Sequence, residues 1–284
     1  MTLPANLSMG AVTLRVENLD LMIAYYRDAV GLEMISELTG SAVLGRNNNP
    51  ALILEHAPEM KHASDNQAGL FHTAFLFDTK AQLAWAVASV ASKYPGSFTG
   101  SADHLVSEAF YFNDPENNGV ELYWDRERSN WSWQHGQIEM GTFGLDPNAF
   151  LRENLPEQLD VTASNIGHVH LSVGSIEQAQ DFYVNKLGFD VTLNWGGTAL
   201  FVSAGGYHHH MAMNIWKSRG AGLRQPTLGL RDVSILLPNA QSLGAVQERL
   251  VSSKVSIRDD GQTIHLDDPW GNQVSFTAFD AKGL

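Results

Sequence analysis

The sequence predicts an α+β fold built from four units, each with one helix and about four strands in the order βαβββ. Two observations predict it. Residues 10–31 and residues 167–188 align without gaps and are identical at six positions. Residues 114–123 (DPENNGVELY) and 268–277 (DPWGNQVSFT) share a closing pattern, in which an Asp-Pro turn leads into a short strand. Self-similarity at a fixed spacing is typical of a chain assembled from repeated structural units.

The elements of each unit follow from the hydrophobic pattern. The first and third units open with an alternating strand, a polar turn and an amphipathic helix that ends at a glycine. The second unit begins with a strand at residues 70–77 and continues with a helix near residues 81–92. The fourth unit begins at residues 230–237, and its helix lies near residues 242–252.

These units group into two halves of similar length. We expect an N-terminal domain at residues 1–125 and a C-terminal domain at residues 165–284, with two units in each. Residues 126–164 are rich in Trp, Pro, Asn and charged residues, and are interpreted as a linker.

Composition excludes several classes of function. The formal net charge of −13 argues against nucleic acid or an anionic membrane as the main partner. The chain has no cysteine, which excludes disulfides, thiolate catalysis and cysteine-ligated metals. The first ten residues lack a basic region followed by an apolar stretch, and no apolar run approaches the ~20 residues of a membrane span. We therefore expect a cytoplasmic protein.

Metal-binding side chains occur at equivalent positions of the repeat. The comparable position of the first strand carries Ala11, His72, His168 and Asp232 in the four units, and the last strands of the second and fourth units carry Glu121 and Ser275. His72, His168 and Glu121 are good metal ligands, and two imidazoles with one carboxylate suit non-haem Fe(II) or Mn(II). His170 is an alternative to His168, because residues two apart on a strand share a face.

The repeat plan and three motifs resemble the vicinal oxygen chelate superfamily of glyoxalases, bleomycin resistance proteins and extradiol dioxygenases. The motifs are GHVHLSV at 167–173, DHLVSEAFYFNDPENNGVELYWD at 103–125, and GYHHH…NIW at 206–216. The resemblance is greatest to the two-domain bacterial catechol-2,3-dioxygenases. It implies two incomplete barrels, a bound Fe(II), and O2-dependent cleavage of a small aromatic diol to a semialdehyde-type product in aromatic hydrocarbon catabolism.

The same resemblance implies roles for particular residues. Tyr111, ten positions before Glu121, and His104 would hydrogen-bond the reacting oxygens. His209 best matches the catalytic acid or base, with His208 and His210 as alternatives. The residues expected to contact substrate are His208, His210, Asn214, Phe110 and Trp216.

One feature departs from the best-known extradiol dioxygenases, in which units three and four supply the ligands. Here the fourth unit has Asp232 and Ser275 at those positions. We therefore hypothesise that units two and three form the metal-binding barrel, and that units one and four form an inactive one. A distance between His72 and His168 above roughly 10 Å would contradict this pairing, since ligand atoms lie about 2 Å from the ion.

Two other functions compete with a dioxygenase. A glyoxalase-type isomerase or lyase usually holds its metal with four protein ligands, including a second carboxylate, but residues 198–216 contain no Asp or Glu. A non-catalytic protein that binds small molecules would need only an apolar cup. The sequence leaves the diol unnamed, and exposed strand edges between the barrels would suit a homo-oligomer.

Overall fold

The computed structural model describes residues 2–64, 66–158 and 165–279, and it contains four βαβββ units in sequence. Unit one comprises β1 (Ser8–Val16), α1 (Leu19–Ala24), the π-helical turn η1 (Tyr25–Val30), β2 (Glu33–Leu38), β3 (Ser41–Arg46) and β4 (Asn49–His56). Unit two comprises β5 (Gly69–Leu76), α2 (Lys80–Lys93), β6 (Phe98–Asp103), β7 (Ser107–Asn113) and β8 (Gly119–Asp125). Unit three comprises β12 (Asn165–Ser172), α4 (Ile176–Ala179), the π-helical turn η3 (Gln180–Lys186), β13 (Asp190–Trp195), β14 (Ala199–Ser203) and β15 (Met211–Asn214). Unit four comprises β16 (Gly229–Leu237), α5 (Ala240–Ser252), β17 (Arg258–Asp259), β18 (Thr263–Asp267) and β19 (Gln273–Ala278).

The predicted helices are confirmed. Helix α2 begins at a capping box, in which the Thr79 side chain accepts from the Gln82 backbone and Gln82 binds back to Thr79. Helix α5 begins after Asn239, whose side chain accepts from the Ser242 backbone. None of the helices in the described part of the chain is long and apolar enough to cross a membrane.

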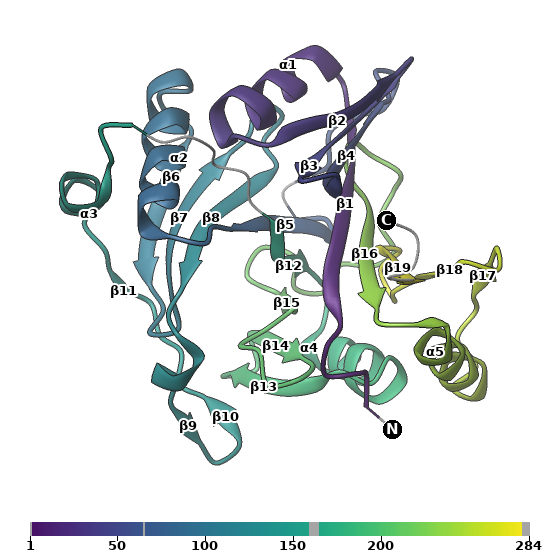
Figure 1. The fold of residues 1–284 in the computed structure, drawn as a ribbon. Helices are drawn as coiled ribbons and strands as arrows, with labels where there is room; N and C mark the ends of the chain where they lie inside the picture. The colour runs from purple at the N-terminus through teal and green to yellow at the C-terminus, as the bar shows by residue number, and fades with distance from the viewer. Residues whose placement is uncertain (1, 65, 159–164, 280–284) are drawn as a thin grey trace.

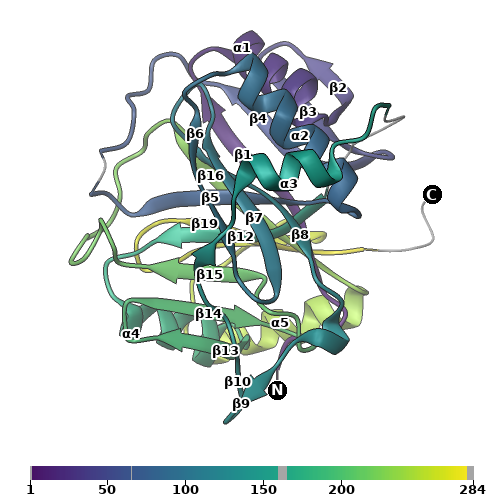
Figure 2. The ribbon, with the colours of Figure 1, turned by 90° about the vertical axis from the view of Figure 1, so that its left-hand side faces the viewer.

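The segment interpreted as a linker contains short elements. They are the 3-10 turn η2 (Arg128–Asn130), β9 (Trp133–Gln134), β10 (Gln137–Ile138), β11 (Phe143–Gly144) and α3 (Pro147–Asn154). Strand β11 pairs with β6, and α3 packs beside α2 (Figure 2). The last part of the expected linker, residues 159–164, lies outside the described residues.

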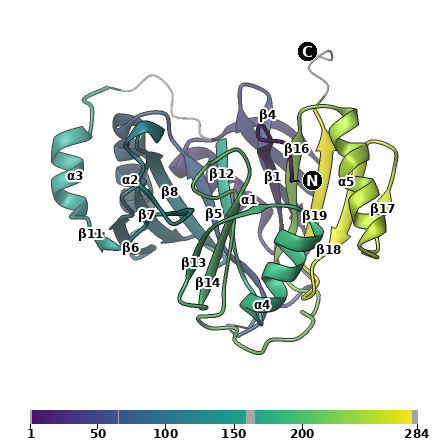
Figure 3. The same ribbon diagram turned by 90° about the horizontal axis from the view of Figure 1, so that it is seen from below.

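The strands form two curled sheets that pair the units crosswise. One sheet has the order β11-β6-β7-β8-β5-β12-β15-β14-β13, which joins units two and three. The other has the order β17-β18-β19-β16-β1-β4-β3-β2, which joins units four and one. Figure 1 and Figure 3 show α2 and α5 at opposite sides of the molecule, where they pack on β8 and on β16 and β19. The strand order confirms the crossed pairing expected from the ligand positions.

Buried hydrogen bonds tie the two sheets together at equivalent places. Tyr26 of η1 donates to Asp114 at 2.8 Å, and Tyr183 of η3 donates to Asp268 at 3.1 Å. Burial raises the pKa of Asp114 to about 6, even though its hydrogen bonds oppose that shift. The repeated tyrosine and the repeated Asp-Pro turn, two separate motifs in the sequence, are therefore partners in the fold.

Candidate metal centre

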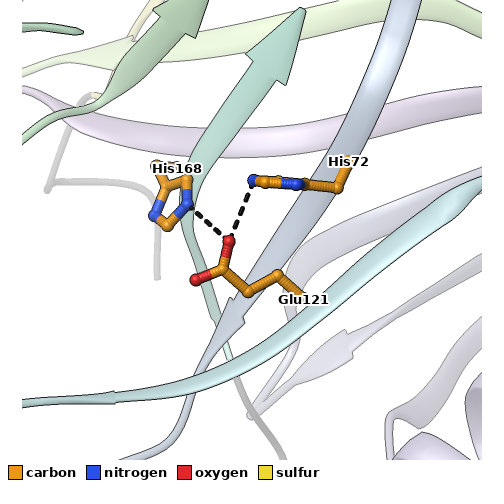
Figure 4. Close-up of side chains that lie close together, drawn as sticks. All are labelled: His72, Glu121 and His168. Atoms are coloured by element: carbon orange, nitrogen blue, oxygen red, sulfur yellow. Dashed lines mark hydrogen bonds and ion pairs between the residues drawn. The ribbon is translucent and has the colours of Figure 1, made fainter. Parts of the chain in front are cut away.

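Three adjacent strands bring His72, Glu121 and His168 together around one small residue. Ala74 of β5 pairs directly with Glu121 of β8 on one side and with His168 of β12 on the other. His72 precedes Ala74 by two residues and therefore shares its face of the strand. Figure 4 shows the His72, Glu121 and His168 side chains pointing toward one another.

The donor atoms are close enough to share one ion. One nitrogen or oxygen from each of the three residues lies within 4.8 Å of the others, well inside the limit set by the crossed-pairing hypothesis. Glu121 Oε2 lies 2.9 Å from His72 Nε2 and 3.1 Å from His168 Nε2. All three side chains are buried.

A backbone irregularity at Gly167 shapes the His168 position. The pairing of β12 with β5 shifts register between Ile166 and His168, as in a β-bulge, which re-aims side chains locally. A Cβ atom on Gly167 would lie 1.6 Å from the Tyr123 hydroxyl oxygen, so only glycine leaves room for that tyrosine. Tyr123 in turn packs on the His168 ring, with centroids 4.8 Å apart.

The charge states suit metal binding. Burial raises the pKa of the Glu121 carboxyl, but the charges of His168 and His72 and the hydrogen bond with His168 outweigh burial and hold the pKa well below its ordinary value. Burial lowers the pKa of His168, and the charge of Glu121 opposes this only in part. A carboxylate and a neutral imidazole are the forms that bind a metal ion.

A buried nitrogen without a hydrogen-bond partner also fits a metal ion at this site. The buried His72 Nε2 makes no hydrogen bond, although Glu121 Oε2 lies only 2.9 Å away. A buried polar atom without a partner is costly, and coordination to an ion would satisfy it. An ion held by two histidines and one carboxylate would keep further coordination positions open.

His170, the alternative ligand, lies beside the cluster and has a different partner. Its ring centroid is 5.0 Å from that of His72, and its Nε2 accepts from Asn214 Nδ2 at 3.1 Å. The Asn214 orientation follows from its other bond, because its Oδ1 accepts from the Trp216 backbone. Asn214 thus contacts a histidine of the site and does not line the pocket.

Tyr111 and His104 form a pair at the edge of the cluster. Tyr111 is the direct cross-strand partner of Glu121. The His104 Nδ1–H donates to the Gly141 carbonyl at 2.6 Å, which leaves Nε2 to accept a hydrogen bond from the Tyr111 hydroxyl, 2.7 Å away. Burial, and then the charge of Glu121, raises the pKa of Tyr111 well above its ordinary value, which keeps the phenol protonated.

The three consecutive histidines point in different directions. The His209 ring packs at a tilt against His168, with centroids 4.1 Å apart, and lines the pocket. His208 lies behind it, with Nε2 2.8 Å from Asp125 Oδ1. His210 Nδ1 lies 2.9 Å from the Ser203 hydroxyl, and burial lowers the pKa of His210 to about 3.

A pocket of about 890 Å³ opens over the cluster. Its aromatic lining residues include Phe71, Tyr111, Trp195, Phe201 and Trp216. Of the five residues expected to contact substrate, Trp216 lines the pocket, whereas His208, His210, Asn214 and Phe110 do not. Phe110 packs in the core against Phe150, with ring centroids 4.8 Å apart.

Several residues of the site were not singled out from the sequence. Met140 and Thr142, from the segment interpreted as a linker, line the pocket. Tyr123 and Asp125 follow Glu121 at intervals of two on β8, so strand alternation alone places them on the face of the site. That periodicity could have identified both.

The crossed βαβββ sheets and the buried cluster of two histidines and one glutamate define a protein with the vicinal oxygen chelate fold and a candidate metal site. The family model of the Glyoxalase/Bleomycin resistance protein/Dioxygenase superfamily matches residues 8–122 and 165–276. The chain belongs to this superfamily.

Individual relatives agree with that membership. The chain is 34% identical to a catechol-2,3-dioxygenase of Bacillus subtilis (strain 168) over 268 residues, which cover 92% of this chain and 93% of the relative. Among solved structures, a candidate dioxygenase from Bacillus subtilis has a TM-score of 0.66 at 13% identity and covers 95% of this chain and 84% of its own. Glyoxalase I from Zea mays has a TM-score of 0.60 at 16% identity, with 96% and 92% covered. At these identities the two structures show the shared fold alone.

Proposed function

We propose that the protein is an extradiol dioxygenase that uses Fe(II) and O2 to open the ring of a catechol-like diol. The observation that carries the proposal is the three-ligand cluster of His72, Glu121 and His168 at the base of an aromatic pocket. The identity to the Bacillus catechol-2,3-dioxygenase supports the same activity. When bound, the metal would supply open positions for the two diol oxygens and for O2.

The pocket residues would orient an aromatic ring above the ligands. Phe71 and Trp216 lie edge to face with ring centroids 5.2 Å apart, and both line the pocket. Such aromatic walls favour a flat apolar substrate through offset and edge contacts. They would also exclude water from the reacting atoms.

Two groups would act on the protons and oxygens of the substrate. His209 Nδ1 is engaged by His208, which leaves Nε2 for the proton of a diol hydroxyl. Tyr111 directs its own proton to His104, so its oxygen can accept a hydrogen bond from the substrate. Burial, and then the neighbouring histidines, lowers the pKa of His209 well below its ordinary value, so the ring is neutral and able to act as a base.

The main alternative is a metal-dependent isomerase of the glyoxalase type. Strands β14 and β15, which continue the metal-site sheet beyond His168, carry no carboxylate. In the described part of the chain, the metal-binding cluster contains one carboxylate, Glu121. A three-ligand site favours the dioxygenase.

The test is reconstitution with Fe(II) under anaerobic conditions, followed by addition of catechol and air. A yellow ring-opened product should form with the wild type and be absent with His72→Ala and Glu121→Ala. A wild type that binds iron yet converts none of several diols would contradict the proposal. Activity that survives both substitutions would contradict the ligand assignment.

A further inference from the structure

A chain of buried and partly buried hydrogen bonds leads from the pocket away from the candidate metal ligands. His209 Nδ1 lies 2.7 Å from His208 Nδ1, and His208 Nε2 lies 2.8 Å from Asp125 Oδ1. The other carboxylate oxygen of Asp125 accepts the Tyr207 hydroxyl proton at 2.8 Å. The His208 side chain is 0% exposed and that of Asp125 is 18% exposed, so bulk water does not compete with these bonds from the His208 side.

The position of each proton in this chain follows from the acceptors. A carboxylate only accepts, so His208 must carry its proton on Nε2, the atom that faces Asp125. The Nδ1 of a neutral His208 then has a lone pair. It can bond to His209 Nδ1 only if His209 carries its proton there, which leaves the His209 lone pair on Nε2.

Two other histidine rings pack beside His208. Its ring lies 5.8 Å from that of His168 and 4.6 Å from that of His209, measured between centroids. The assignment applies to the neutral His208 ring, because a second proton would make its Nδ1 a donor and reverse the assignment at His209.

We propose that Asp125 and His208 are positioning residues that hold His209 in the Nδ1–H form, with the Nε2 lone pair facing the pocket. The catalytic use of that lone pair rests on the proposed function, in which His209 takes a proton from the diol. The Asp125 carboxylate also stabilises the imidazolium that forms at His209, because the two are linked through His208.

The first test reads the tautomer directly. The full chain, labelled with ¹⁵N-histidine and freed of metal with EDTA, is examined by long-range ¹H–¹⁵N correlation at neutral pH. The His209 signals are identified by their loss in His209→Gln. We expect a protonated Nδ1 and an unprotonated Nε2; a proton on Nε2, or on both nitrogens, would overturn the proposal.

Variants then separate positioning from a merely structural role. Asn at position 125 can donate as well as accept, so Asp125→Asn should give His209 a mixed or reversed tautomer. We expect kcat to fall at least tenfold with little change in KM, by analogy with the loss of about 10⁴ that the same change causes in serine-protease triads. Tyr207→Phe removes a neighbouring hydrogen bond of Asp125 and should keep the tautomer, as should Asp267→Asn, a change in an exposed pair with Arg258 on the other sheet. A His209 tautomer that stays the same in Asp125→Asn would contradict the proposal.

The outcomes keep the two proposals apart. The wild-type spectrum decides the tautomer without turnover, even if Asp125→Asn does not fold. A protein that shows the expected tautomer but cleaves no diol would contradict the proposed function and leave the positioning by Asp125 and His208 supported. A protein that cleaves diols while His209 carries its proton on Nε2 would support the proposed function and contradict the positioning by Asp125 and His208.

Discussion

His168 Nε2 lies 3.1 Å from Glu121 Oε2, although the two residues belong to different halves of the chain. This contact exists because β12 of unit three pairs with β5 of unit two, and β5 pairs with β8. Neither half alone contains all three candidate ligands. The candidate site therefore depends on the crossed sheet, and several measurements can test that dependence.

Removing the shared carboxylate should abolish metal binding. In Glu121→Gln the oxygen between the two histidines loses its charge, and we expect the affinity for Fe(II) or Mn(II) to fall by about 100-fold or more. This loss exceeds the roughly 10–100-fold loss typical of changing a residue that only hydrogen-bonds to a metal ligand. The measurement is metal content after equilibrium dialysis. Glu248→Gln, an exposed change on α5, is the matched control and should retain the metal. Equal binding by both variants would show that Glu121 is not a ligand.

The small size of Ala74 should matter as much as the ligands themselves. Ala74→Leu would place a bulky side chain between Glu121 and His168 without altering any ligand. We expect metal affinity to fall at least about tenfold, while overpacking costs about 1–3 kcal/mol of stability. Ala42→Leu, a buried position in the other sheet, controls for overpacking and should keep its metal. Full metal affinity in a folded Ala74→Leu variant would place the ion elsewhere.

Gly167 should tolerate no side chain. Gly167→Ala would force the Tyr123 hydroxyl away from the backbone beside His168. We expect a loss of about 1–3 kcal/mol in the free energy of unfolding, together with weaker metal binding. Gly144→Ala, whose added Cβ would meet nothing within 4 Å, should behave like the wild type in denaturant titrations. A Gly167→Ala protein as stable as this control would refute the close packing of Tyr123.

Buried Asp114 should give stability a measurable pH dependence. Its pKa is raised from 3.8 to about 6 in the folded protein, so between these values the folded state binds more protons than the unfolded state. Stability from this group is therefore present at low pH and is lost, by about 3 kcal/mol, as pH rises through 6. The stability difference between the wild type and Asp114→Asn should shrink over that range. Tyr26→Phe removes a hydrogen-bond donor to the carboxylate and should extend the loss of stability to higher pH. A stability difference between the wild type and Asp114→Asn that does not change with pH would contradict the raised pKa of Asp114.

Much of this fold was predictable because repetition is a strong signal. The gap-free match of residues 10–31 with 167–188, and the two Asp-Pro turns, determined the number and order of the units. The ligand positions then predicted the crossed pairing, because only units two and three supply a full set. What repetition could not reveal is that Tyr26 and Asp114 are hydrogen-bonded partners.

The surroundings of the ligands were harder to predict from the sequence. The directions of His208, His209 and His210 depend on the turn before β15, which breaks the alternation of a strand. Met140 reaches the pocket from a segment without a repeat counterpart. Both features arise from long-range packing, for which a single sequence carries no local signal.

The most direct measurement is the fate of labelled oxygen. The Fe(II)-loaded protein is given ¹⁸O₂ and catechol, and the product is examined by mass spectrometry. Ring cleavage by a dioxygenase predicts one ring-opened product that contains both atoms of the same O2 molecule. A product without label, or an intact diol with iron bound at His72, Glu121 and His168, would contradict the proposed function.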